Sequence, residues 1–102
     1  MSEDSKLLKE KMRDIGNYLF KEVHFNHNQL RITYNEQKDT VSLPILSKAY
    51  TSTYYRDLAL YKAKNLLQSI LPEYIDVSYN AIHLKTKQVH LIHSMLRLQQ
   101  LI

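Results

Sequence analysis

The sequence predicts an α+β domain, because the spacing of its apolar residues changes repeatedly along 102 residues. In three stretches these residues recur every three or four positions, the period of an amphipathic helix, and elsewhere they alternate with polar residues, the period of a strand. We expect the order N-terminal helix, β-hairpin, long central helix, short strand or second hairpin, and C-terminal helix. A chain of this length builds one hydrophobic core, so residues 1–102 are interpreted as a single domain.

The first helix is expected from about Lys6 to Val23. Its apolar residues are separated by steps of four, three, four and four, which places them along one narrow stripe. These residues are Leu8, Met12, Ile15, Leu19 and Val23.

A β-hairpin should follow, because the apolar period changes from 3.6 to 2. Leu30, Ile32 and Tyr34 alternate with polar residues, and so do Val41, Leu43 and Ile45 after a short polar turn. Proline lacks the N–H that a strand donates to its neighbour. Pro44 therefore requires either that the second strand lies at a sheet edge or that its proline side is free.

The central helix is expected from about Thr53 to Leu71, with hydroxyl side chains before it for N-capping and Pro72 after it. On a helical wheel one broad arc is apolar and faces the core. It contains Ala59, Leu60, Ala63, Leu66, Leu67, Ile70 and Leu71, with Arg56 near its middle.

The last quarter of the chain is predicted as a strand region followed by a helix. Ile75, Val77 and Tyr79 alternate, and Ile82 and Leu84 alternate after them, which indicates a strand with a turn or bulge, or a short second hairpin, within residues 74–85. The helical period then returns from about residue 87 to residue 102.

Composition excludes several functional classes. Zero cysteine excludes disulfides, thiolate metal sites and a cysteine nucleophile, and one glycine excludes the loops that cradle phosphates. No nucleophile elbow is present, and the closest carboxylate pair in an apolar setting is Glu73 and Asp76. We therefore expect a protein that is not an enzyme and that needs no cofactor. With no apolar run near the roughly 18 residues of a membrane span and an acidic first segment, the expected location is the cytoplasm.

The five histidines form a weak metal-binding pattern. Two pairs have His-x-x-His spacing, His24 with His27 and His90 with His93, and His83 stands alone. This spacing differs from the proven i, i+4 zinc pair, and no glutamate lies between the pair members. We interpret them as surface histidines and expect no metal.

One line of side chains on the central helix lies opposite its core arc. Tyr54, Leu58, Tyr61 and Asn65 follow steps of four, three and four. Tyrosine combines a large apolar area with a polar tip and is enriched in protein interfaces. We interpret this line as a partner-binding face; the alternative is that the sheet or the last helix packs over it.

The last helix is apolar around most of its circumference. One row contains Leu91, Met95, Leu98 and Ile102, and Val89, Ile92 and Leu96 form a neighbouring row. One packing neighbour does not bury that much surface. The first row is therefore predicted to mediate homodimerisation, the alternatives being burial between two layers of the same chain or contact with another protein.

The net charge of +4 is concentrated late in the chain, because no acidic residue follows Asp76. Anion or nucleic-acid binding is the functional interpretation of this region, and a solvated edge is the alternative. The candidate residues are Lys85, Lys87, His90, His93 and Arg97, with Gln100 on the same helix face.

Two functions from different classes follow. The first is a non-enzymatic regulatory or adaptor protein that binds a protein partner through the tyrosine line and self-associates. The second is a winged-helix-like nucleic-acid-binding regulator, with residues 43–50 as a short helix, 53–71 as the recognition helix and 74–92 as the wing. Asp57 on the outward face and Arg56 on the apolar arc argue against the second.

Overall fold

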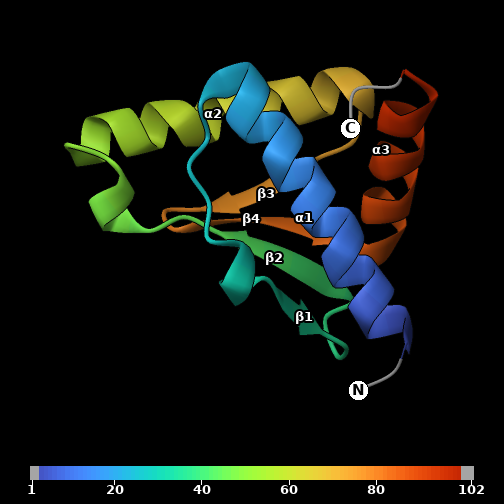
Figure 1. Ribbon diagram of the computed structural model, residues 1–102. Helices are drawn as coiled ribbons and strands as arrows, with labels where there is room; N and C mark the ends of the chain where they lie inside the picture. Colours follow the sequence, from blue (N-terminus) through green and yellow to red (C-terminus); the bar gives the residue numbers. More distant parts are fainter. Residues whose placement is uncertain (1–2, 100–102) are drawn as a thin grey trace.

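A computed structural model describes residues 3–99, which form three α-helices, two short 3-10 helices and a four-stranded antiparallel sheet (Figure 1). This architecture confirms the predicted α+β class and the predicted element order. The elements are α1 (Glu3–Val23), η1 (Gln29–Arg31), β1 (Thr33–Asn35), β2 (Thr40–Pro44), η2 (Ser47–Ala49), α2 (Thr53–Ile70), β3 (Asp76–Ser78), β4 (Ala81–Lys85) and α3 (Thr86–Leu98).

The strands lie in the order β1-β2-β4-β3, and every neighbouring pair is antiparallel. Residues 74–85 therefore contain the second hairpin, and this hairpin joins the first in one sheet. The two central strands are β2 and β4, with Val41 opposite Leu84 and Leu43 opposite Ile82. Because α2 lies between β2 and β3 in the sequence, the chain leaves the middle of the sheet and returns at its far edge.

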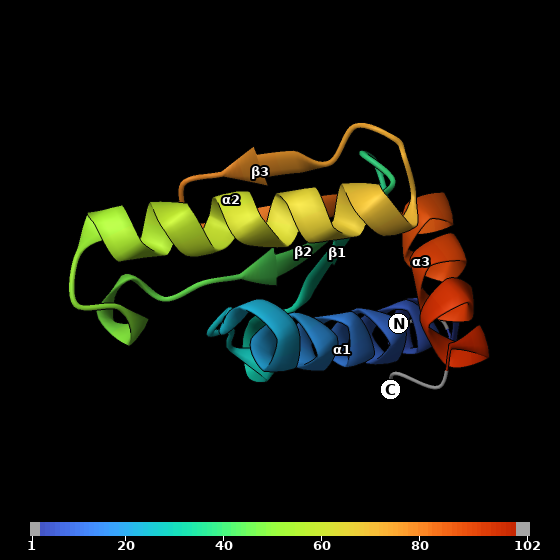
Figure 2. The same cartoon turned by 90° about the horizontal axis from the view of Figure 1, so that it is seen from above.

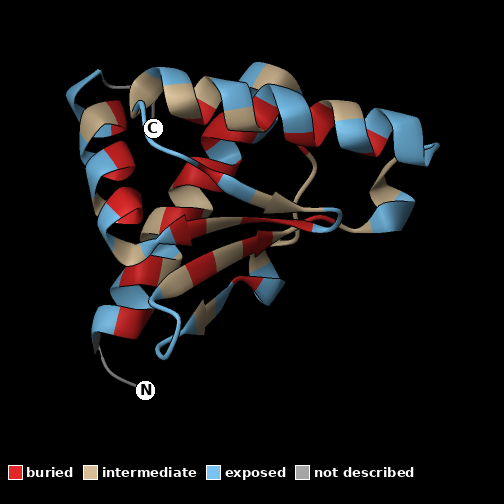
Figure 3. Cartoon of the chain, turned by 180° about the vertical axis from the view of Figure 1, so that it is seen from behind, coloured by how far each residue is buried: buried red, intermediate tan, exposed pale blue. Residues whose placement is uncertain are grey.

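The helices cover one face of the sheet. Figures 1 and 2 show α1 crossing that face, α2 beside α1 toward the β3 edge, and α3 at one end of the strands. Val41, Leu43, Ile82 and Leu84 are completely buried between the sheet and the helices. Ser42 and its cross-strand neighbours point to the other face, which no helix crosses when the sheet is seen from behind (Figure 3). One covered face makes this a two-layer domain.

The stripe predicted on α1 is confirmed as a core element. Its first four residues are buried, and Val23 packs against the core from its edge. Each fully buried side chain of this size contributes about 1.5–3 kcal/mol of hydrophobic stabilisation. The buried residues are Leu8, Met12, Ile15 and Leu19.

Pro44 occupies a central strand without disrupting it. The Ile45 N–H donates to the Asn80 carbonyl at 2.8 Å, so the nitrogen of Pro44, one residue earlier, faces the opposite side. There β1 has already ended, because its first residue, Thr33, pairs with Ser42. The second of the two predicted arrangements, a free proline side, is the one observed.

The start of the first strand differs from the prediction. Leu30 is 94% exposed, whereas Ile32 is buried and Tyr34 packs against the core. The Asn28 side chain accepts a hydrogen bond from the Leu30 N–H at 3.0 Å and caps η1. This local bond holds the backbone in a 3-10 turn, so the alternating pattern begins two residues later than expected.

Helices α1 and α3 pack side by side through polar contacts. The Lys11 ammonium donates to Nδ1 of His90 at 3.0 Å, and Nε2 of His93 donates to Oδ2 of Asp14 at 2.8 Å. Both partners advance by three residues between these contacts, so the two helices run in the same direction here. Burial is the main cause that lowers the pKa of His90 below 6.5, and Lys11 lowers it further.

Gly16 permits a close approach between α1 and the loop that follows it. A Cβ at this position would lie 3.1–3.2 Å from three atoms of the His27 ring, so the imidazole packs flat on the helix backbone. Nδ1 of His27 is buried without a hydrogen-bond partner, and burial lowers the pKa of this side chain.

Within residues 3–99, no helix has the length and apolar character needed to cross a membrane.

A double-mutant cycle tests the packing of Gly16 against His27. In the H27A background, G16A should stabilise the protein by roughly 0.5–1 kcal/mol, the usual gain of alanine over glycine inside a helix. In the wild-type background the added methyl crowds the imidazole, so the gain should be smaller or reversed. Urea unfolding of the four proteins measures the coupling, and additive free energies would contradict this contact.

The protein should lose stability on acidification, in part through His90. The unfolded chain protonates this residue near 6.5, whereas the folded chain protonates it at lower pH because of burial and Lys11. Unfolding therefore takes up a proton, so stability falls as pH drops below 6.5 and levels off below the folded pKa. Urea unfolding between pH 7.5 and 5 should show a shallower decline in H90Q, and an unchanged decline would refute this assignment.

Candidate functional site

The outer face of α2 is exposed, as the sequence predicted. Tyr54 and Tyr61 are 66% and 63% exposed, Asn65 is exposed, and Leu58 is half-buried between them. The opposite face holds the helix on the sheet through Ala59, Leu60, Ala63 and Leu67, all buried. The alternative, in which the sheet or the last helix packs over the tyrosine line, is not observed among the described residues.

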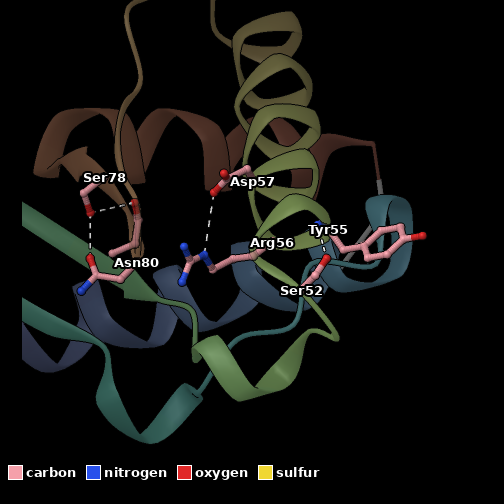
Figure 4. A network of polar contacts seen from close by, with 7 residues as sticks. Ser52, Tyr55, Arg56, Asp57, Ser78 and Asn80 are labelled. Carbon is pink, nitrogen blue, oxygen red and sulfur yellow. Dashed lines mark hydrogen bonds and ion pairs between the residues drawn. The ribbon is translucent and has the colours of Figure 1, made fainter.

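The N-terminal end of α2 is fixed by a side-chain cap. Ser52 has an extended backbone, and its hydroxyl accepts a hydrogen bond from the Tyr55 N–H at 3.4 Å (Figure 4). This cap fixes where the helix begins, and therefore the angular positions of the side chains that follow. The Tyr55 ring is exposed and meets the Tyr54 ring edge-on, with centroids 5.3 Å apart and an interplanar angle of 77°.

Exposed tyrosines gather around α2 more densely than the sequence pattern indicated. Five of the eight tyrosines are exposed, and all five lie on α2 or beside it. Three were not predicted, namely Tyr55, Tyr74 and Tyr79. Tyr55 lies 100° around the helix from Tyr54, outside the narrow line, and the other two fall in the segment whose fold was ambiguous. The only feature of the sequence that could have indicated these further exposed tyrosines is its large tyrosine content, eight residues in 102.

Two cation–π contacts hold Tyr74 and Tyr79 against the flank of α2. Nζ of Lys64 lies 4.8 Å from the centroid of the Tyr74 ring, and Cζ of Arg56 lies 5.3 Å from that of Tyr79. The two rings flank β3, so this short edge strand is attached to the helix at both ends. Such contacts contribute about 0.5–1 kcal/mol at exposed positions.

A pocket of about 470 Å³ opens beside the tyrosine line. It lies between the end of α1, the η2 turn and the first half of α2. Tyr55 and Leu58 belong both to its lining and to the outer surface of the helix. Val23, His24, Tyr50 and Lys62 line the remaining sides, together with smaller residues.

Hydrogen bonds fix the wall of this pocket. The Tyr50 hydroxyl accepts from the Asn26 N–H at 2.7 Å and donates to the His24 carbonyl at 3.3 Å. The Asn26 amide donates to the Ala49 carbonyl at 3.1 Å. Burial raises the pKa of Tyr50, so its hydroxyl keeps its proton at neutral pH. These bonds tie the loop after α1, where His24 has a left-handed φ of 57°, to the η2 turn.

The two apolar rows of α3 have different environments. Val89, Ile92 and Leu96 are completely buried in the core. In the row predicted for homodimerisation, Leu91 is exposed, Met95 is half-buried and Leu98 is 85% exposed. Ile102 lies outside the described residues. Intrachain burial therefore accounts for one row, while in the other row Leu98 keeps most of its surface at solvent and Leu91 and Met95 are partly covered.

The basic C-terminal residues do not form one free strip. Lys85, Lys87 and Arg97 are exposed, but His93 is buried against Asp14 and His90 is half-buried beside Lys11. The i, i+3 spacing of the histidines places both on the side of α3 that packs against α1. The anion-binding interpretation counted them as solvent-facing, and this part of it is wrong. Gln100 lies outside the described residues.

The elements of the winged-helix alternative are arranged differently. Leu43 and Pro44 end β2, and a 3-10 turn of three residues follows in place of a helix over residues 43–50. The segment 74–92 is divided between β3, β4 and the first half of α3, and its strands complete the central sheet.

No group of three or more histidine, aspartate or glutamate side chains placed to hold a metal ion occurs among the described residues. His83, on the uncovered sheet face, instead contacts two hydroxyls. Its Nδ1 lies 2.7 Å from Ser42 Oγ and its Nε2 lies 3.0 Å from Ser78 Oγ, which links β2, β4 and β3.

Comparison of this chain with protein-family models, with curated proteins and with solved structures found no match.

Proposed function

We propose that this protein is a non-enzymatic regulatory or adaptor protein that binds a protein partner through the outer side of α2. The surface comprises Tyr54, Tyr55, Leu58, Tyr61 and Asn65 and is called the tyrosine surface below. The observation that supports this proposal most directly is that Tyr54, Tyr55 and Tyr61, three of the five exposed tyrosines, all lie on this one helix.

The chemistry of tyrosine favours binding at this surface. Its ring offers a large contact area with few rotatable bonds, so little side-chain entropy is lost when a partner covers it. The edge-on contact of Tyr54 with Tyr55 restricts both rings before a partner arrives. A surface of restricted aromatic side chains beside a pocket has the character of an interface hot spot.

The pocket beside the tyrosine surface suggests the chemistry of the partner. Its lining is mainly apolar and aromatic, and its volume accommodates a large aliphatic or aromatic side chain. Of the ten lining residues, Lys62 alone carries a formal charge at neutral pH. We therefore expect an apolar anchor residue on the partner with an acidic residue near it.

Self-association through α3 forms a second part of the proposal. Leu91, Met95 and Leu98 form an apolar row on the outer side of the helix, and Leu98 is among the most exposed large apolar side chains of the described chain. A row that meets its own copy is covered symmetrically on both molecules. A dimer of this kind would leave the tyrosine surface of each copy free.

The role of the tyrosine surface can be tested by site-specific photo-crosslinking. A photoreactive amino acid at position 54 or 61 should capture the partner in cells, and one at Leu30 on η1 should not. With the captured protein in hand, Y54A/Y61A should weaken its binding at least tenfold in calorimetry, because each change removes a hot-spot contact.

Leu30→Ala serves as the matched control, since Leu30 is an exposed apolar residue away from α2. All these changes are at exposed side chains and should alter the free energy of unfolding by less than about 0.5 kcal/mol. Equal capture at positions 54 and 30, or undiminished affinity in the double variant, would refute the proposal.

The role of α3 can be tested by light scattering on a sizing column. The wild-type protein should elute with the mass of a dimer, and L91Q/L98Q should elute as a folded monomer, because polar side chains remove the apolar contact. A wild-type protein that is monomeric at high micromolar concentration would contradict self-association.

A further inference from the structure

Arg56 is the most buried charged side chain of α2. It is 8% exposed and lies on the apolar side of the helix, opposite the tyrosine surface and next to the turn that joins β3 to β4. Figure 4 shows its side chain extending from the first turn of α2 toward that turn, on the side of Ser78 and Asn80. A charged side chain this deeply buried is normally paired and hydrogen-bonded.

The guanidinium of Arg56 is incompletely satisfied. Its Nε is fully buried and has no hydrogen-bond partner. The nearest carboxylate oxygen, Oδ1 of Asp57, lies 3.8 Å away, which is too long for a hydrogen bond. The Asp57 side chain is 66% exposed, so water screens its attraction for Arg56. The Tyr79 ring lies over the guanidinium, with its centroid 5.3 Å from Cζ. The Nε–H bond lies in the guanidinium plane, so a ring above that plane does not serve as its hydrogen-bond acceptor.

A buried N–H without an acceptor costs free energy in the isolated protein, and a ligand that supplies an acceptor recovers it. The edge formed by Nε and one terminal nitrogen matches the two oxygens of a carboxylate. A phosphate dianion fits the site less well, because Asp57 already places a negative charge beside the guanidinium and a dianion is repelled by it more strongly than a monoanion.

We propose that the Nε edge of Arg56 is a carboxylate-binding site, at which the ligand takes the position that Asp57 approaches and Asp57 turns outward to solvent. The inference goes beyond the tyrosine surface, because the two sites lie on opposite sides of α2 and require different ligand chemistry. The carboxylate comes either from a small organic acid or from an acidic side chain of a bound peptide.

Nuclear magnetic resonance tests this directly, because the buried Nε–H gives its own ¹H–¹⁵N signal, identified by its absence in R56K. Titration of the wild-type protein with sodium acetate should shift this signal saturably, and sodium chloride at equal ionic strength should not. A capped peptide, acetyl-Ala-Asp-Ala-amide, is the second arm. Tighter binding of the peptide than of acetate assigns the site to a protein ligand, and equal binding assigns it to a small acid.

Three variants separate this site from a merely structural arginine. D57N should bind acetate severalfold more tightly, because the competing carboxylate is removed. R56M should lose saturable binding, observed at the Tyr79 backbone amide. K64M is the matched control, since it removes the other stacked cation of α2 and should bind acetate as the wild type does.

The proposal is overturned if acetate leaves the Arg56 Nε–H signal unmoved or shifts it no more than chloride does. Weaker acetate binding in D57N would show that Asp57 is not displaced, and a response to phosphate but not to acetate would refute the carboxylate assignment. Neither titration involves the tyrosine surface, so failure here leaves the proposed function standing, and Y54A/Y61A should bind acetate normally.

Discussion

The burial of a single sheet face is the constraint on which the rest of the molecule depends. Val41, Leu43, Ile82 and Leu84 form the apolar floor of the core, and α1 and α2 must both lie on it to exclude water. The hydrophobic contribution of these two layers scales with the apolar area that they cover. The register of β2 against β4 places all four side chains on the same face, so a shift of one residue would turn them to solvent.

This constraint also determines which surfaces are free. One side of α2 packs against the sheet, and in a two-layer fold no further layer covers its other side. The tyrosines on that outer side therefore remain exposed to solvent. The α3 helix packs at the end of the strands against α1, so one of its two apolar rows is buried and the other is only partly covered within the described residues. Free surface on both helices therefore follows from having two layers and about a hundred residues, and the residue types on it carry the functional argument.

Periodicity predicted what repeats regularly and missed what depends on neighbours distant in the sequence. The α1 stripe, the limits of α2 and the first hairpin follow from local spacing, so the sequence was sufficient for them. For residues 74–85 local spacing left a bulged strand and a second hairpin as alternatives, and the pairing of β3 with β4 decides between them. Leu30 departs from its strand because one Asn28 hydrogen bond stabilises a turn. His93 is buried because Asp14, 79 residues earlier, supplies its acceptor. Tyr79 joins the α2 flank through Arg56, another contact that no local pattern records.

The strand order has a consequence for how the chain folds during its synthesis. The two middle strands, β2 and β4, are adjacent in space, but α2 and β3 separate them in the sequence, and their pairing runs from Thr40–Lys85 to Pro44–Ala81. A nascent chain that has emerged only through α2 holds β1 and β2 of the sheet but lacks the central partner of β2. The apolar floor of the sheet is completed only after β4 (Ala81–Lys85) has left the ribosome, because Ile82 and Leu84 lie on that strand.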